Sequence, residues 1–174
     1  SGGSNINLMR AESPGPSVGK LVPKVKHTAR ILYIIYLGLS LIEFIILLLA
    51  KMPVFDAMNT TFGTAGTGGF GIKNSSLGGY SVTIQWIVTV FMILFGVNFN
   101  AYYLMLFGSI KKALTMEEVR AYFGIILTSI VIITINIYSM CSSVWDAITK
   151  SAFQVGSIIT TTGFSTIDFN LWPQ

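Results

Sequence analysis

The chain has 174 residues, of which 52% are apolar and 10% are charged, and its formal net charge is +4. Soluble domains carry about 25% charged residues, so most of this surface is not hydrated. The composition excludes a typical cytosolic enzyme, a disordered tail and a nucleic-acid-binding protein. With one cysteine, Cys141, and one histidine, His27, an intrachain disulfide, a cysteine-based zinc cluster and a histidine-dependent catalytic triad are excluded. The composition predicts a membrane protein that is not an enzyme.

Three stretches of the chain predict membrane-spanning helices. Residues 1–27 are polar and broken by prolines, and we expect a cytoplasmic linker there, with no cleavable signal peptide. The apolar stretch at residues 28–50 can cross a hydrocarbon layer of about 30 Å as a helix. The stretches at 82–110 and 119–141 predict two further spans, joined by a loop at 111–118. The expected fold class is an all-α polytopic membrane protein.

Basic residues set the expected orientation of these spans. The regions before the first span and between the second and third spans lie on one side of the membrane. These regions and the span ends that border them hold eight of the eleven lysine and arginine residues: Arg10, Lys20, Lys24, Lys26, Arg30, Lys111, Lys112 and Arg120. Because basic residues concentrate in cytoplasmic loops, we expect this side to face the cytoplasm.

Two segments on the opposite side, residues 53–80 and 144–174, are neither spans nor plain hydrophilic loops. In the first, Pro53 can open a short helix, because its fixed φ suits a first helical turn. Apolar runs this short are more often re-entrant than spanning. The Gly/Thr string that follows, Gly63–Gly71, is irregular backbone, which survives at membrane depth only beside protein or water. We expect a helix that descends into the membrane and a strand that climbs back.

The second segment repeats the plan of the first. Val144-Trp145-Asp146-Ala147 matches Val54-Phe55-Asp56-Ala57, and Thr160-Thr161-Thr162-Gly163-Phe164 matches Gly66-Thr67-Gly68-Gly69-Phe70. Between the shared Asp-Ala and Gly-Phe pairs, the second copy has four more residues, about one helical turn. An internal repeat with interrupted hydrophobic segments is typical of a transport pathway at the repeat interface.

Each predicted unit, the complete one at residues 28–110 and the partial one at 119–174, contains a Thr/Gly strand that suits a bare cation. An ion entering a narrow pore loses water and needs oxygens, which inward-pointing backbone carbonyls can supply. Glycine tolerates the required dihedrals, including φ > 0, and threonine adds a hydroxyl acceptor. Neither strand contains a carboxylate, so an ion would bind weakly enough to leave.

The Thr/Gly strings have two other possible interpretations. Glycine-rich strings often mark flexible turns, but two copies, each after a short helix on the same side, favour pore loops. Residues 66–71 also spell G-x-G-x-x-G, the dinucleotide-binding pattern. That pattern needs a preceding strand and a helix that opens at once, whereas residues 72–79 predict another loop.

At these residues the chain resembles the Trk/Ktr/HKT superfamily of potassium uptake proteins, in particular the bacterial Trk-type pore-forming subunit. The resemblance covers nearly the whole chain, and its motifs are Met9–Pro16, Thr67–Gly71, Thr160–Phe169 and Leu171–Pro173. It implies a potassium-channel-like fold, in which four units of span, re-entrant pore helix, filter and span surround one pore. The motifs match the second and third units.

The resemblance implies which residues bind potassium. Six filter residues are expected, with the glycines in third place of each strand as the key ones: Thr67, Gly68, Gly69, Thr161, Thr162 and Gly163. Asp168 is expected at the outer mouth of the pore. Potassium is the transported ligand, and no cofactor is implied. Two strands cannot encircle an ion, so we expect a fragment of a longer protein.

The resemblance also implies partners and a location. These are the remaining repeat units of the same longer chain, a second copy in a homodimer, a cytoplasmic nucleotide-binding regulatory subunit and the lipid bilayer. Nucleic acid is not expected. The expected location is the bacterial inner (cytoplasmic) membrane, which the chain crosses several times.

Several polar residues have two possible roles. Glu43, inside the first span, predicts a structural polar contact rather than transport. Asn98 can join helices or line a pore. Asp56 and Asp146 can stabilise the start of their short helices or attract cations. Lys73 would oppose cation entry unless it points away or is paired.

The predicted function is potassium uptake through a pore with Thr/Gly carbonyl filters. The first alternative is a sodium-permeable or weakly selective transporter of the same superfamily. In related plant members a serine in place of a filter glycine favours sodium, and both positions are glycine here. The alternative from another class is a non-transporting membrane anchor or assembly subunit.

Overall fold

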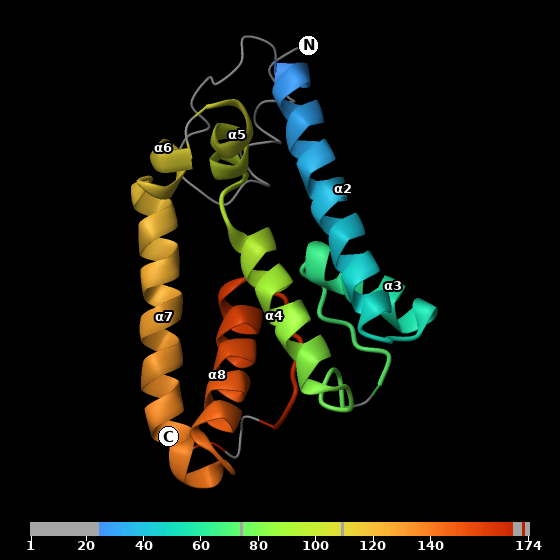
Figure 1. Ribbon diagram of the computed structural model, residues 1–174, viewed down its shortest axis with the longest axis vertical. Helices are drawn as coiled ribbons and strands as arrows, with labels where there is room; N and C mark the ends of the chain where they lie inside the picture. The colour runs from blue at the N-terminus through green and yellow to red at the C-terminus, as the bar shows by residue number, and fades with distance from the viewer. Residues whose placement is uncertain (1–24, 74, 109, 169–171, 173–174) are drawn as a thin grey trace. The chain divides into compact units, whose positions relative to one another are not determined.

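The computed structural model describes residues 25–73, 75–108, 110–168 and 172 (Figure 1). These residues form helices and no strand, in the order α2 (Val25–Leu49), α3 (Val54–Ala65), α4 (Val82–Gly96), α5 (Phe99–Phe107), α6 (Ile110–Leu114), α7 (Glu117–Ile137), the 3₁₀ turn Tyr138–Met140 and α8 (Val144–Ile159). Most of the predicted linker at 1–27 and most of the motif Leu171–Pro173 lie outside the described residues.

Within the described part of the chain, two helices are long and apolar enough to cross a membrane, at Ala29–Leu49 and Glu117–Met140. Both expose large apolar side chains along their length, as Leu41 and Leu49 do on the first and Ile125 and Ile135 on the second. A helix that is apolar on its outer face is stable in lipid, where no polar partner is required. The predicted spans at 28–50 and 119–141 therefore correspond to α2 and α7.

The predicted span at 82–110 is divided into α4 and α5, which together count as a third candidate span. The division lies at Asn98, whose extended backbone (φ −55°, ψ 118°) interrupts the helix. Its side chain accepts a hydrogen bond from the Asn100 N–H at 2.9 Å and caps α5. It also donates to the Glu118 carboxylate, at the start of α7. An asparagine that caps a helix cannot continue the preceding one, so an unbroken helix over 82–110 does not form.

The chain folds into two compact units. The described part of the first comprises residues 25–37, 97–108 and 110–122, with a small apolar cluster of Val97, Ala101, Ala113 and Val119. The second comprises residues 38–96 and the described residues from Phe123 onward, and it contains both segments that were predicted to be re-entrant.

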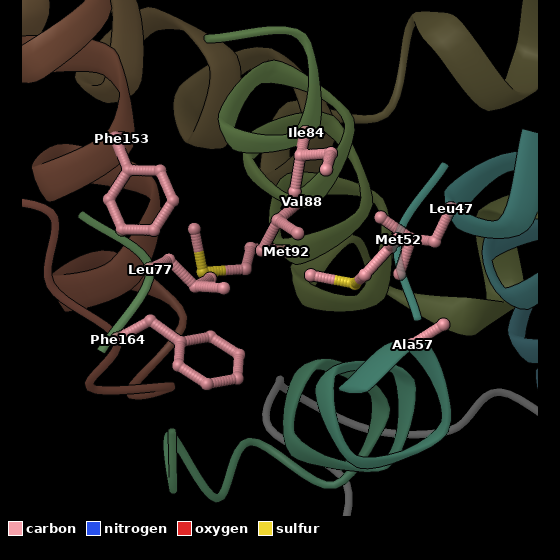
Figure 2. Close-up of a cluster of buried hydrophobic side chains, with 9 residues drawn as sticks. All are labelled: Leu47, Met52, Ala57, Leu77, Ile84, Val88, Met92, Phe153 and Phe164. Carbon is pink, nitrogen blue, oxygen red and sulfur yellow. The ribbon is translucent and has the colours of Figure 1, made fainter. Parts of the chain in front are cut away.

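In the second unit α4 packs against both α3 and α8 (Figure 1). The Trp86 indole N–H on α4 donates to the Thr149 hydroxyl on α8 at 3.1 Å. The Trp86 ring stacks on that of Trp145, with 5.5 Å between the ring centroids. One core joins these elements, as Figure 2 shows, and its members are Leu47, Met52, Ala57, Leu77, Ile84, Val88, Met92, Phe153 and Phe164. Residues from both re-entrant segments thus share one apolar core.

Candidate functional site

Both predicted re-entrant segments contain a short helix followed by irregular backbone, which we call hairpin 1 (α3 and residues 66–71) and hairpin 2 (α8 and residues 160–165). Pro53 precedes α3 with φ −54°. Ser143 caps α8, because its hydroxyl accepts the Asp146 N–H at 3.1 Å. The helices have 12 and 16 residues, so the four additional residues of the second copy lie in α8.

The two helices end with the same hydrogen bonds. In hairpin 1, the N–H of Gly68 donates to the carbonyl of Gly63 at 2.8 Å. In hairpin 2, 94 residues later, the N–H of Thr162 donates to the carbonyl of Ser157 at 2.9 Å. Gly66 and Thr160, which end the helices, have nearly equal dihedrals (φ −85°, ψ 2° and φ −90°, ψ 1°). The matching strings of the sequence therefore adopt matching backbone.

The left-handed residues recur at matching positions as well. Thr67 and Gly69 have φ of 49° and 63°, and Thr161 and Gly163 have φ of 59° and 88°. Positive φ is uncommon for a β-branched residue such as threonine, and such outliers gather at functional sites. Because left-handed residues alternate with Gly68 and Thr162, whose φ is not positive, successive peptide carbonyls can turn toward one side of each strand.

The two strands lie against each other. A Cβ atom on Gly69 would be 2.0 Å from the Thr162 carbonyl oxygen and 2.8 Å from the carbonyl carbon of Gly163. A Cβ atom on Gly163, in contrast, would meet no described atom within 4 Å. Beyond the strands, the Leu77 N–H donates to the Ser165 carbonyl at 2.9 Å, and the Ser165 N–H donates to the Ser76 hydroxyl at 3.2 Å. The structure thus brings the two predicted key glycines together, and no described residue fills the space beside Gly163.

The threonine side chains of the strands differ in exposure. Thr67 and Thr161 are exposed. Thr162 is 2% exposed, and its hydroxyl shares a hydrogen bond of 2.7 Å with that of Thr160. A hydroxyl held in this way lies within the protein, so the acceptor that Thr162 offers toward the neighbouring strand is its carbonyl oxygen. Among the described residues, no three His, Cys, Asp or Glu side chains form a metal-binding group.

Charged residues at the ends of the hairpins have close partners. Tyr80 donates to the Asp56 carboxylate at 2.6 Å, and the Lys73 ammonium lies 4.0 Å from the centre of the Tyr80 ring. Burial, together with Asp56, raises the pKa of Tyr80 to about 12. Lys73 is therefore paired with an aromatic ring.

In hairpin 2, the partner of the aspartate is Lys150 instead of a tyrosine. Its ammonium donates to Asp146 at 2.7 Å, and this hydrogen bond holds the pKa of the Asp146 carboxyl below its usual value. The N–H of Ser142 also donates to Asp146, at 3.2 Å. Asp168, predicted at the outer mouth, is exposed.

Hairpin 2 is held in place by Ser157, which the sequence interpretation did not single out, and by Phe164 and Gly63, which it included only as members of the repeated strings. The Ser157 hydroxyl donates to the Phe164 carbonyl at 2.5 Å, directly after the key glycine. The ring of Phe164 lies against Gly63 of hairpin 1, where a Cβ atom would be 2.7 Å from the ring. Ser157 and Gly63 each stand six positions before the key glycine of their own strand. An alignment of the two copies that began six positions before each key glycine could have paired Ser157 with Gly63. It could not have revealed the contacts that these residues make.

A family model of cation transport proteins, TrkH, matches residues 2–174. The chain belongs to this family. The all-α membrane fold predicted from the sequence is confirmed by the crystal structure of the potassium transporter TrkH from Vibrio parahaemolyticus, with a TM-score of 0.80 and 31% sequence identity. The match covers 90% of this chain and 35% of that one.

Relatives of similar sequence include the Trk system potassium uptake protein TrkH of Salmonella typhimurium, which is 34% identical over 99% of this chain. The Trk system potassium uptake protein TrkG of Escherichia coli is 29% identical over 95% of this chain. The chain spans 37% of the length of the first and 35% of the second. It thus corresponds to about a third of these TrkH-family transporters.

Proposed function

We propose that this TrkH-family chain is part of a longer protein that takes up potassium across the bacterial inner membrane, and that hairpins 1 and 2 supply two strands of its selectivity filter. The observation that carries the proposal is the pair of left-handed positions in each strand, Thr67 with Gly69 and Thr161 with Gly163. It is supported by the transported ion named for the Salmonella and Vibrio relatives.

The proposed mechanism is passive and involves no covalent chemistry. A potassium ion loses water at the filter and is coordinated by backbone carbonyls of residues 67–69 and 161–163. Uncharged oxygens bind the ion weakly enough for release, and the ion then follows its electrochemical gradient. The space beside Gly163 that no described residue fills is available to the ion and to the strands of the rest of the longer chain. Two further strands from the rest of the longer chain complete the coordination.

Potassium is the preferred ion in this proposal because both key positions, Gly69 and Gly163, are glycine. A sodium-permeable relative is the alternative. The basic pair Lys111-Lys112, on the side predicted to be cytoplasmic, offers a contact surface for a nucleotide-binding regulatory subunit. The complete protein is proposed to form a homodimer.

The test is ion flux into vesicles that contain the complete protein. Gly163→Arg places a cation in the open space beside the filter, and we expect potassium uptake to be lost while membrane insertion is retained. Ser142→Arg, at an exposed position before α8, adds the same charge away from the strands and is expected to retain uptake. Uptake that survives Gly163→Arg would contradict the proposal and favour a non-transporting anchor. Equal sodium and potassium flux in the unmodified protein would favour the weakly selective alternative.

A further inference from the structure

The aromatic residue after each key glycine has a different environment in the two hairpins. Phe70 follows Gly69, and Phe164 follows Gly163 at the matching position. Phe164 is 1% exposed, whereas Phe70 is 86% exposed. The backbone of the two strands is alike up to these residues, so the difference arises from what surrounds them.

Phe164 is covered by hairpin 1. Its ring occupies the space that a side chain at position 63 would fill, because a Cβ atom there would be 2.7 Å from the tip of the ring. Figure 2 shows the ring beside Leu77 in the shared core, at the edge of the second hairpin. The Ser157 hydroxyl holds the backbone at the base of the ring through the Phe164 carbonyl. A small residue six positions before one key glycine thus forms a socket for the phenylalanine of the next hairpin.

No described residue forms such a socket for Phe70. The backbone beside it, at residues 66–71, is irregular, and irregular backbone at membrane depth must be covered by protein or line a water-filled space. A large apolar ring does not suit a water-filled space. Protein is therefore the cover that fits Phe70, and the matching position in hairpin 2 shows what that cover looks like.

We propose that Phe70 docks onto another re-entrant hairpin of the same longer chain, one that precedes hairpin 1. Its ring would lie beside a small residue six positions before the key glycine of that hairpin, as Phe164 lies beside Gly63. The relatives leave room for such a segment, because this chain spans 37% of the Salmonella protein. Each of these two phenylalanines would then join its hairpin to the preceding one.

This inference rests on the proposal that the complete protein contains further hairpins, but it does not depend on which ion passes. It is tested by placing the photoreactive residue p-benzoylphenylalanine at position 70 in the complete protein in native membranes. After irradiation, cross-linked peptides are identified by mass spectrometry. We expect a cross-link to a peptide of the same chain from outside the present 174 residues, at the end of a short helix before a Thr/Gly string.

Position 164 supplies the matched control, because the same photoreactive residue there should cross-link to α3 near Gly63. If position 164 cross-links as expected while position 70 cross-links to lipid, to a second copy or to residues within this chain, the inference is overturned. The outcome of this test can be distinguished from a failure of the proposed function. Correct cross-links in a protein without potassium uptake would refute the function alone, and uptake with cross-links elsewhere would refute the docking alone.

A second measurement uses smaller changes, in case the photoreactive residue prevents folding. Phe70→Ala should empty the socket and lower the potassium-to-sodium flux ratio several-fold, because the strand that bears Gly69 loses its anchor. Phe70→Tyr keeps the ring and should restore most of the ratio. Phe55→Ala, on an exposed face of α3, is the control and should leave the ratio unchanged. A flux ratio that is the same in Phe70→Ala as in the unmodified protein would count against the docking role.

Discussion

Hairpins 1 and 2 share their backbone and differ in their surroundings. Both end their helices with the same hydrogen bonds and carry left-handed residues at matching places. Yet Gly69 is in contact with the Thr162 carbonyl, whereas no described residue lies within 4 Å of a Cβ atom on Gly163. The comparison teaches that local hydrogen bonding shapes each strand, while contacts between hairpins determine how much change each strand tolerates. Substitutions at matching positions should therefore have unequal effects.

The largest difference is expected between Gly69→Ala and Gly163→Ala. Both alanines must adopt positive φ, which costs about 1–2 kcal/mol. Only the Cβ atom at position 69 also overlaps backbone, 2.0 Å from the Thr162 oxygen, and backbone cannot rotate away as a side chain can. We expect Gly69→Ala to abolish potassium uptake by the complete protein, and Gly163→Ala to retain part of it where the ion, rather than a further strand of the longer chain, lies beside Gly163. Equal loss in the two variants would place a further strand beside Gly163, and equal retention would show that the two hairpins are not in contact as the structure places them.

The next largest effect is expected at Glu43 of α2, which is completely buried against Thr64 of hairpin 1. The Thr64 hydroxyl donates its proton to the Thr60 carbonyl at 2.8 Å, so it can only accept a hydrogen bond from position 43. Glu43→Gln supplies an N–H donor and should change stability by less than about 1 kcal/mol. Glu43→Lys buries a cation inside a span, at a cost of about 2.5–3.5 kcal/mol on insertion scales.

The measurement is the amount of complete protein that inserts into the membrane and its thermal unfolding. A loss of inserted protein for Glu43→Lys, with normal insertion of Glu43→Gln, is the expected pair of results. If both variants insert normally, Glu43 does not have the buried contact described above, and a location facing water would be required.

The spans and the two hairpins could largely be predicted from the sequence, because short local patterns of residues specify them. Apolar length predicted α2 and α7, and the Val-x-Asp-Ala and Gly-Phe matches located both hairpins. The division between α4 and α5 was missed, because Asn98 in an apolar stretch resembles a polar contact within a span as much as a helix cap. The contact of Phe164 with Gly63 was also missed, since residues 101 positions apart meet only through tertiary packing.

A smaller effect is expected from the hydroxyl that holds hairpin 2. Ser157→Ala removes the donor to the Phe164 carbonyl and should lower the free energy of unfolding by about 1 kcal/mol. Ser151→Ala, in the same helix and equally buried, is the matched control, because within the described residues its hydroxyl has no hydrogen-bond partner. Thermal unfolding of the complete protein should show a lower midpoint for Ser157→Ala alone. A similar midpoint for both variants would mean that the Ser157 hydrogen bond contributes nothing.

The smallest effects are expected at the aspartates near the start of each helix, and they have opposite pH dependence. The pKa of Tyr80, raised to about 12, means that its hydrogen bond to Asp56 stabilises hairpin 1 fully below pH 10, and that this stabilisation is lost as the pH rises from 10 to 12. The lowered pKa of Asp146 means that its pairing with Lys150 contributes above the ordinary aspartate value of 3.8 and is lost as the pH falls through the folded-state value.

These two dependences can be separated by substitution and measured as unfolding midpoints across pH. Tyr80→Phe should remove part of the alkaline loss and leave the acid limb unchanged, whereas Asp146→Asn should remove part of the acid loss and leave the alkaline limb unchanged. The change for Asp146→Asn should be small, because Asp146 and Lys150 are partly exposed and solvent screens such pairs. If each substitution altered both limbs, the two hairpins would be titrating as one network rather than as separate contacts of Asp56 and Asp146.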